Sequence, residues 1–160
     1  MITCYIGLGS NLENPVEQVS TALEELSQIP ETRVEISSSL YRSDPVGPPG
    51  QPDYINAVAC LMTTLEPHAL LDHLQAIEQA HDRKRIQHWG PRTLDLDLIL
   101  YGDQNIQTDR LNVPHPFAKE RAFVLWPLAE ITNELIFPDG TVLSELLVQC
   151  PVGSLEKISL

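Results

Sequence analysis

Two acidic side chains interrupt a run of leucines near the middle of the chain. Asp95 and Asp97 stand two residues apart, and the alternate positions hold Leu94, Leu96, Leu98 and Leu100. Side chains two apart on a β-strand point to the same face, so both carboxylates are expected to project together, opposite the leucines. Neighbouring carboxylates in an apolar setting repel each other and are costly to desolvate. Mg²⁺ relieves that cost, since it takes oxygen ligands and keeps positions for water and phosphate.

A group of cations lies directly upstream of the aspartates, at Arg83, Lys84, Arg85 and Arg92. Arginine and lysine side chains bind phosphate oxygens well. Acidic residues that can hold a metal, next to basic residues that can bind phosphate, indicate phosphoryl-transfer chemistry. An Asp-x-Asp pair by itself is a weak signal, because most such pairs are exposed acids of loops and strand edges. The leucine run and the basic flank together favour the metal site.

The elements that would hold these residues follow a β-α-β-β-α-β order. Apolar patterns predict strands over residues 2–8, 33–40, 54–62 and 94–101. Helices are predicted from Pro15 to Leu26, with Asn14 as the N-cap, and from Pro67 onward. This order predicts the α+β class with a ferredoxin-like βαββαβ core.

Residues after 102 are expected to form a C-terminal α/β extension on the same core, so that 1–160 is a single domain. Residues 118–129 would hold one or two short helices broken by Pro127, and residues 142–148 another short helix. Asp139 and Gly140 predict a turn. Residues 7–11 lack the third glycine and the lysine of phosphate loops, so a turn after the first strand is expected there.

Composition and charge narrow the function classes. The chain has 160 residues, of which 42% are hydrophobic and 20% charged, as in ordinary globular proteins. No secretory signal or bilayer-spanning run is visible, so we expect a cytoplasmic protein without a membrane partner. Cys4, Cys60 and Cys150 fit neither a disulfide framework nor zinc spacing, and the first two are interpreted as core residues.

The charge distribution favours a small anionic ligand. A net charge of −12 argues against a nucleic-acid partner. Seven of the ten Lys and Arg residues fall in 83–121 against five acids, so this segment is +2 and the remainder −14. A basic island in an acidic protein suits a small anion better than a long polyanion.

Two segments are predicted to be loops, and each keeps two interpretations. Residues 43–53 hold four prolines and two glycines, and form either a stiff connector or part of a site. Residues 82–90 are basic, and Trp89 is either a lid over an aromatic ligand or packed on the core.

Two further polar positions stay open in the same way. Asn56, on one strand face with Tyr54, is either a structural bracket or a reader of a heterocycle edge. His115, between two prolines, is either a loop residue or a donor to phosphate.

Residues 89–100 resemble the signature of the 6-hydroxymethyl-7,8-dihydropterin pyrophosphokinases, a family of folate biosynthesis. Other segments match that family in the same order, namely residues 9–12, 41–43, 47–48, 51–57, 110–111, 113–116 and 121–125. The resemblance covers the chain from about residue 2 to 147. It implies transfer of the diphosphoryl group of ATP to the pterin hydroxymethyl, with release of AMP.

The resemblance also implies roles for individual residues. Asp95 and Asp97 would hold two Mg²⁺ ions, and with Arg83 and Arg92 they form the catalytic set. The implied pterin-binding residues, with Tyr54 and Phe123 enclosing the ring, are Ser43, Asp44, Pro45, Val46, Gly47, Tyr54, Asn56, Trp89, Asp95 and Phe123. The implied ATP-binding residues are Gln75, Glu78, Arg83, Arg85, Trp89, Arg92, Arg110, Asn112, His115 and Arg121.

The chain departs from the family pattern at a few places. Asp44 stands where a more neutral residue is expected, and Asn112 where threonine is common. The loop before Trp89 is shorter than in a familiar member, so the division of roles between Arg83 and Arg85 stays open. ATP and a dihydropterin are the expected partners, and a monomer is the expected state.

Two other classes of function fit the sequence less well. A metal-dependent nuclease or nucleotidyltransferase would use the paired aspartates but needs a broad basic groove, which the net charge of −12 disfavours. A noncatalytic ligand-sensing module would need neither the aspartates on an apolar strand nor the flanking cations. The paired aspartates and flanking cations favour phosphoryl transfer, and the resemblance implies that it is a pyrophosphokinase reaction.

Overall fold

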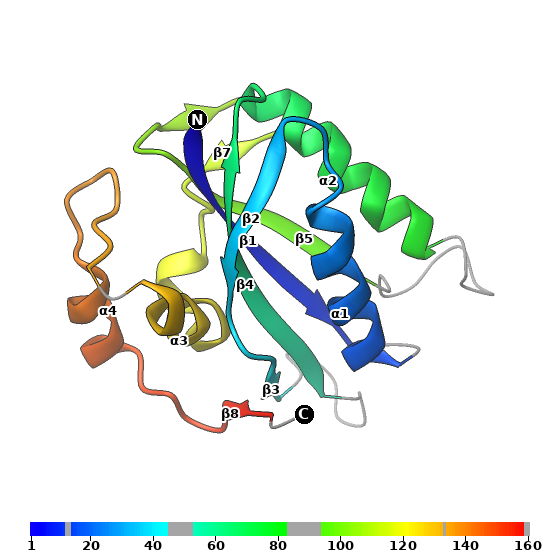
Figure 1. Ribbon diagram of the computed structural model, residues 1–160. Coiled ribbons are helices and arrows are strands. Elements are labelled where there is room, and N and C mark those ends of the chain that lie inside the picture. The colour runs from blue at the N-terminus through cyan, green and yellow to red at the C-terminus, as the bar shows by residue number, and fades with distance from the viewer. Residues whose placement is uncertain (12–13, 45–52, 83–93, 133, 159–160) are drawn as a thin grey trace.

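The computed structural model describes residues 1–11, 14–44, 53–82, 94–132 and 134–158 (Figure 1). Its strands are β1 (Ile2–Ser10), β2 (Thr32–Ser37), β3 (Tyr41–Ser43), β4 (Tyr54–Thr63), β5 (Asp95–Tyr101), β6 (Ile106–Gln107), β7 (Asn112–Val113) and β8 (Glu156–Lys157). Its helices are α1 (Pro15–Leu26), α2 (Pro67–Asp82), the short 3-10 helix η1 (Ala118–Glu120), α3 (Ala122–Ile131) and α4 (Leu143–Gln149).

The main sheet is antiparallel and has β1 and β4 at its centre. Strand β1 pairs with β4 on one side and with β5 on the other, while β2 and β3 both pair with β4. Strand β8 extends the sheet by pairing with β3. The order β1-α1-β2-β4-α2-β5 confirms the predicted ferredoxin-like core and the α+β class.

Helices cover both faces of this sheet (Figure 1). One apolar cluster joins Val19, Ala22 and Leu26 of α1 and Leu70 and Leu74 of α2 to the first face. A second cluster joins the other face to α3 and α4, around Val58, Leu125, Leu128, Phe137 and Leu143. The predicted C-terminal extension therefore supplies the third layer.

A β-bulge in β5 changes which leucines share a face. Ile6 pairs with Leu98 but Tyr5 pairs with Leu100, so Ile99 is an extra residue on β5. Leu94, Leu96 and Leu98 face α1 and α2, whereas Ile99 and Leu100 pack in the cluster under α3. The predicted face was wrong at Leu100, because strict alternation holds only as far as the bulge.

The predicted strand over 33–40 is found as β2, but it ends at Ser37, and a further short strand, β3, begins only at Tyr41; both pair with β4. A register shift between Val34 and Ile36 turns the Ile36 side chain toward solvent, where it is 48% exposed. Residues 7–11 were also misassigned, since Gly7 and Gly9 are extended residues of β1 and not part of a turn. Cys4 and Cys60 are buried as predicted.

Helix boundaries were predicted better than their caps. Pro15 begins α1 as expected, but Asn14 has φ 63° and its side chain makes no capping hydrogen bond. Pro127 lies within α3 and does not break it; Pro127 is buried, and its burial helps to offset the missing backbone donor. Among the described residues, no helix has the length and apolarity needed to cross a membrane.

Candidate active site

The floor of the candidate site is set by sheet register. Asp95 on β5, Gly9 on β1 and Asn56 on β4 lie side by side in one row across three strands. Strand spacing separates the backbones of Asp95 and Asn56 by roughly 9–10 Å. A Cβ on Gly9 would meet the Asn56 side-chain oxygen at 3.4 Å, so the absence of a side chain there keeps the floor open. A concave surface results between β5 and α3.

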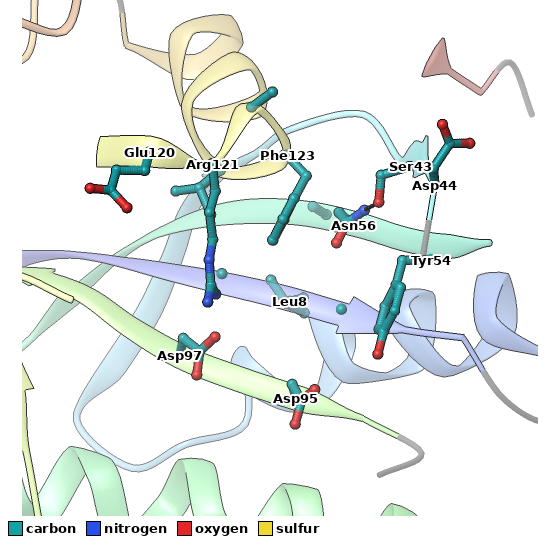
Figure 2. Close-up of a pocket in the computed structure, with 15 residues that line it drawn as sticks. Leu8, Ser43, Asp44, Tyr54, Asn56, Asp95, Asp97, Glu120, Arg121 and Phe123 are labelled. Atoms are coloured by element: carbon teal, nitrogen blue, oxygen red, sulfur yellow. Dashed lines mark hydrogen bonds between the residues drawn. The ribbon is translucent and has the colours of Figure 1, made fainter. Parts of the chain in front are cut away.

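The first cavity occupies this floor and has a volume of about 480 Å³ (Figure 2). Aromatic side chains line it from two elements, Tyr54 from β4 and Phe123 from α3. Asn56 is 3% exposed, and its Nδ2 donates to Ser43 Oγ at 2.7 Å. Two aromatic rings and a fixed amide suit a flat heterocycle with hydrogen-bonding edges.

The second cavity adjoins the first and has a volume of about 540 Å³. Its wall is more polar and includes Gln75, Arg110, Asn112 and His115. Arg110 donates to Asp72 Oδ1 at 2.6 Å and to Gln75 Oε1 at 2.9 Å, which fixes a cation at the rim. A polar cavity with guanidinium groups suits a phosphorylated ligand.

Three residues line both cavities: Asp95, Asp97 and Arg121. The two carboxylates project from the same face of β5, as the sequence predicted (Figure 2). The first cavity also holds Asp44 and Glu120, so four carboxylates accompany one guanidinium there. A polyphosphate could approach this wall only with cations that offset those negative charges.

The donor set at the shared wall fits Mg²⁺. No group of three His, Cys, Asp or Glu residues suited to a metal ion occurs within the described ranges. Mg²⁺ does not require one, since one or two carboxylates commonly hold it while water and substrate phosphates complete the shell. The oxygen ligands of Asp95 and Asp97 meet that requirement.

Arg121 lies between two aromatic rings. Its guanidinium carbon is 5.2 Å from the ring centre of Phe117 and 5.6 Å from that of Phe123. Both contacts are cation–π interactions, which hold the guanidinium at the shared wall. Phe117 is 52% exposed, and no sequence pattern selected it as a site residue.

His115 is a neutral hydrogen-bonding group in this environment. Burial lowers its pKa and the Arg121 charge lowers it further, against the opposing effect of Asp97. Its Nδ1 accepts a hydrogen bond from the Phe117 backbone N–H at 3.3 Å. A neutral ring whose Nδ1 accepts carries its proton on Nε2, so His115 can donate that proton to an anion.

Glu78 joins α2 to the strand that carries the aspartates. Its Oε2 accepts a hydrogen bond from the backbone N–H of Leu96 at 2.8 Å. Leu96 lies between Asp95 and Asp97, and β5 is an edge strand of the described sheet. The Glu78 carboxylate thus takes the place of a neighbouring strand, a contact that sequence spacing did not reveal.

Replacing Glu78 by alanine should destabilise the fold as well as disturb the site. The Leu96 N–H would be left buried and unpaired, at a cost of about 1–3 kcal/mol. Urea unfolding measures the change, with the exposed Glu17→Ala on α1 as the matched control. Equal unfolding free energies for the two variants would contradict the structural role of Glu78.

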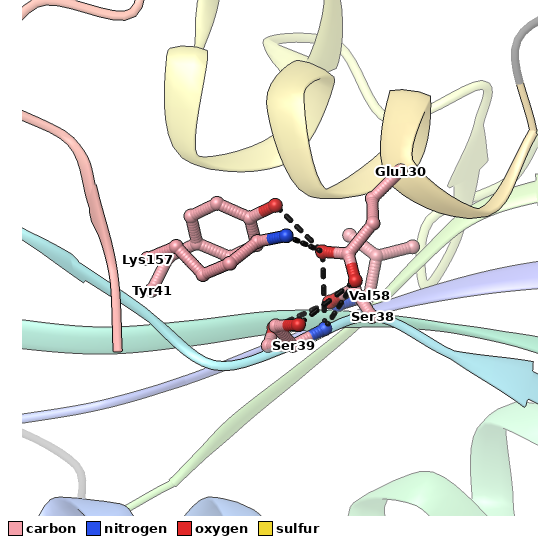
Figure 3. Close-up of polar contacts among 6 residues, drawn as sticks. All are labelled: Ser38, Ser39, Tyr41, Val58, Glu130 and Lys157. Atoms are coloured by element: carbon pink, nitrogen blue, oxygen red, sulfur yellow. Dashed lines mark hydrogen bonds and ion pairs between the residues drawn. The ribbon is translucent and has the colours of Figure 1, made fainter. Parts of the chain in front are cut away.

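A second polar network fixes α3 against β3 (Figure 3). Glu130 of α3 accepts from Tyr41 Oη at 2.6 Å and from Ser39 Oγ at 2.8 Å. Lys157 of β8 lies 3.9 Å from the same carboxylate. Partial burial raises the pKa of Glu130, but the Tyr41 and Ser39 hydrogen bonds and the Lys157 charge outweigh it and lower the pKa overall.

Glu130→Gln should therefore have a pH-dependent effect on stability. Because the folded pKa lies below the unfolded one, ionised Glu130 stabilises the fold above the unfolded pKa of about 4.3. That contribution is lost as the pH falls through the folded pKa. Unfolding free energies of the two proteins should differ most near neutral pH and converge in acid. A difference that grows in acid would contradict this assignment.

Of the predicted site residues, those within the described ranges fall into two groups. The first cavity gathers Ser43, Asp44, Tyr54, Asn56, Asp95, Asp97, Arg121 and Phe123. The second cavity gathers Gln75, Glu78, Asp95, Asp97, Arg110, Asn112, His115 and Arg121. The predicted residues Pro45, Val46, Gly47, Arg83, Arg85, Trp89 and Arg92 lie outside the described ranges.

Two adjoining cavities with carboxylates at their common wall are the geometry of a two-substrate transferase. Comparison with known proteins gives the particular family. The 7,8-dihydro-6-hydroxymethylpterin-pyrophosphokinase family matches residues 5–133. The chain therefore belongs to that family.

Named relatives are similar over nearly the whole chain. A 2-amino-4-hydroxy-6-hydroxymethyldihydropteridine pyrophosphokinase of Pseudomonas aeruginosa is 51% identical, over 96% of this chain and 95% of the relative. One of Haemophilus influenzae is 50% identical, over 93% of each chain.

Solved structures support the fold at lower identity. A Plasmodium falciparum HPPK-DHPS structure has a TM-score of 0.73 at 14% identity, over 92% of this chain. The chain spans 45% of the length of that solved protein. This likeness bears on the fold alone.

Proposed function

We propose that the chain transfers the β,γ-diphosphoryl group of ATP to the hydroxymethyl oxygen of 6-hydroxymethyl-7,8-dihydropterin. The oxygen bonds to the β-phosphorus, the bond from the β-phosphorus to the bridging oxygen of AMP breaks, and the hydroxyl proton is released. Family membership supports the reaction. The observation that carries the site assignment is the pair Asp95 and Asp97 at the wall common to both cavities.

The pterin occupies the first cavity in this proposal. Tyr54 and Phe123 supply apolar surface for the ring faces, and the Asn56 amide meets the ring edge. Since one Asn56 N–H already donates to Ser43, the second N–H and the oxygen are available to the heterocycle. The Asn56 amide can therefore bind both a hydrogen-bond donor and a hydrogen-bond acceptor on the edge of the pterin ring.

ATP occupies the second cavity, with its phosphates toward the shared wall. Arg110 and the His115 Nε2–H donate to phosphate oxygens, while Gln75 and Asn112 contribute polar contacts. Arg121 faces both cavities, so its guanidinium stabilises the negative charge on the diphosphoryl group during its transfer. Asp95 and Asp97 would hold two Mg²⁺ ions, which would supply charge neutralisation and alignment of the phosphates.

The described side chains carry out alignment more than proton transfer. Bringing the hydroxymethyl oxygen in line with the bond that breaks accounts for much of the catalysis of phosphoryl transfer. We assign no committed general base. ATP and the pterin are the proposed partners, and a monomer in the cytoplasm remains our prediction.

The metal requirement is testable by calorimetry with α,β-methylene-ATP. Affinity should be about tenfold or more tighter in Mg²⁺ than in EDTA, because the carboxylates at the shared wall otherwise repel the phosphates. Equal affinity in EDTA would contradict the proposed role of Asp95 and Asp97 and leave the family assignment intact.

A further inference from the structure

The C-terminal segment contacts the strand that borders the first cavity. Strand β8 pairs with β3, placing Lys157 opposite Tyr41 and Glu156 opposite Arg42. The Ile158 N–H donates to the Leu40 carbonyl at 2.8 Å. This segment lies beyond residues 5–133, the part that the family pattern matches.

Side-chain contacts extend this pairing to the cavity wall. Ser154 Oγ donates to Asp44 Oδ2 at 2.6 Å, and Asp44 lines the first cavity. The Asp44 carboxylate points away from Asp95 and Asp97 (Figure 2). Ser154 therefore holds this negative charge on the side away from the shared wall. The Glu156 carboxylate lies 3.8 Å from Arg42.

Lys157 connects the segment to the opposite wall of the cavity. Its ammonium lies 3.9 Å from Glu130, which also accepts from Tyr41 (Figure 3). Glu130 belongs to α3, the helix that begins at Ala122 and carries Phe123. Strand β3 and α3, which border the cavity from two sides, are joined directly by the Tyr41–Glu130 hydrogen bond, and the C-terminal segment adds the β8 pairing to β3 and the Lys157 charge beside Glu130.

We propose that residues 154–158 position the β3 wall of the first cavity and that Ser154 is a positioning residue for the pterin. Resting on the proposed function, this assigns a role in substrate binding to a segment outside the matched family region. Among the residues that the structure describes, the hydrogen bonds and ion pairs of 154–158 reach no residue of the second cavity. Loss of the segment should therefore weaken pterin binding and leave nucleotide binding unchanged.

The test measures two dissociation constants for each variant. Pterin binding is measured by fluorescence with saturating α,β-methylene-ATP and Mg²⁺, and binding of the analogue is measured alone. Ser154→Ala should raise the pterin Kd about threefold, as expected for one exposed hydrogen bond, with the nucleotide Kd unchanged. Ser154→Thr should restore the pterin Kd, and the exposed Ser144→Ala of α4 is the matched control.

A second pair of variants tests the strand pairing itself. Ile158→Pro removes the N–H that donates to Leu40, whereas Ile158→Ala keeps it and removes only side-chain atoms. The proline variant should raise the pterin Kd roughly tenfold relative to the alanine variant. In an Asp44→Ala background, which has no acceptor for the Ser154 hydroxyl, Ser154→Ala should add little, because the two residues act together.

Unchanged pterin Kd values in Ser154→Ala and Ile158→Pro would overturn the inference. So would equal losses of pterin and nucleotide affinity, which would indicate a general loss of stability. If the wild-type chain bound no pterin, the proposed function would fail instead, so the two failures are distinguishable.

Discussion

Replacing either aspartate of the shared wall by asparagine should lower AMP production by roughly 10²–10³-fold, the range for losing one electrostatic contact in a reacting site. Asp95→Asn and Asp97→Asn each remove one anionic oxygen ligand from a set of two carboxylates. Stability should be retained or rise slightly, because repulsion between the pair is relieved. Initial rates in saturating Mg-ATP measure the first effect, and urea unfolding measures the second.

Asp103→Asn is the matched control for these variants. Asp103 is an exposed aspartate just past β5, outside both cavities. Its change should leave the rate within twofold, as for most surface substitutions. Near-normal rates in both site variants would show that the pair is not the metal site. Unfolded site variants would contradict the expectation that the acids serve chemistry more than stability.

Arg121→Ala should give the second-largest loss, roughly 10²-fold in kcat. The guanidinium faces both cavities and is held between Phe117 and Phe123, so it is placed before substrates arrive. The interaction of the guanidinium with the diphosphoryl group is strongest in the transition state of the transfer. The loss of Arg121 should therefore lower kcat more than nucleotide affinity. Single-turnover rates and the Kd of α,β-methylene-ATP separate the two effects.

Arg121→Lys tests whether the planar group matters. Lysine keeps the charge but neither stacks between rings in the same way nor donates in a fork, so it should recover only part of the rate. The control is Arg33→Ala, whose exposed side chain pairs with Glu35 at 2.6 Å on β2. A full recovery by lysine would reduce the role of Arg121 to charge alone, and equal losses in kcat and affinity would contradict the transition-state role.

The order of the core elements was predictable because local signals agreed with the tertiary structure. Alternating apolar residues, Pro15 at a helix start and the Asp-x-Asp spacing each depend on residues close in sequence. They placed the two carboxylates on one face of β5, and that prediction is confirmed. Residue types alone thus indicated the fold class.

The details that failed depend on partners distant in sequence. The bulge at Ile99 arises from the pairing of β5 with β1. The lengths of β2 and β3 are set by their pairing with β4. The Glu78 contact with Leu96 spans eighteen residues and requires α2 to cross the edge of β5. No local pattern contains that information.

Residue types selected many of the site residues from the sequence, but they did not assign each residue its role. Tyr54, Asn56 and Phe123 could be grouped as heterocycle contacts only by resemblance, whereas the cavity now groups them by position. Phe117 and Ser154 were not selected, because an exposed ring and an exposed hydroxyl have no signal without their neighbours. Their positions became informative beside Arg121 and Asp44.

The most direct test of the central claim is the identity of the nucleotide product. The purified chain is incubated with 6-hydroxymethyl-7,8-dihydropterin and Mg-ATP, and the nucleotides are separated by anion-exchange chromatography. The account predicts AMP in amounts equal to the pterin consumed, and no AMP when either the pterin or Mg²⁺ is withheld. Formation of ADP in place of AMP, or AMP without loss of the pterin, would contradict diphosphoryl transfer across the wall formed by Asp95 and Asp97.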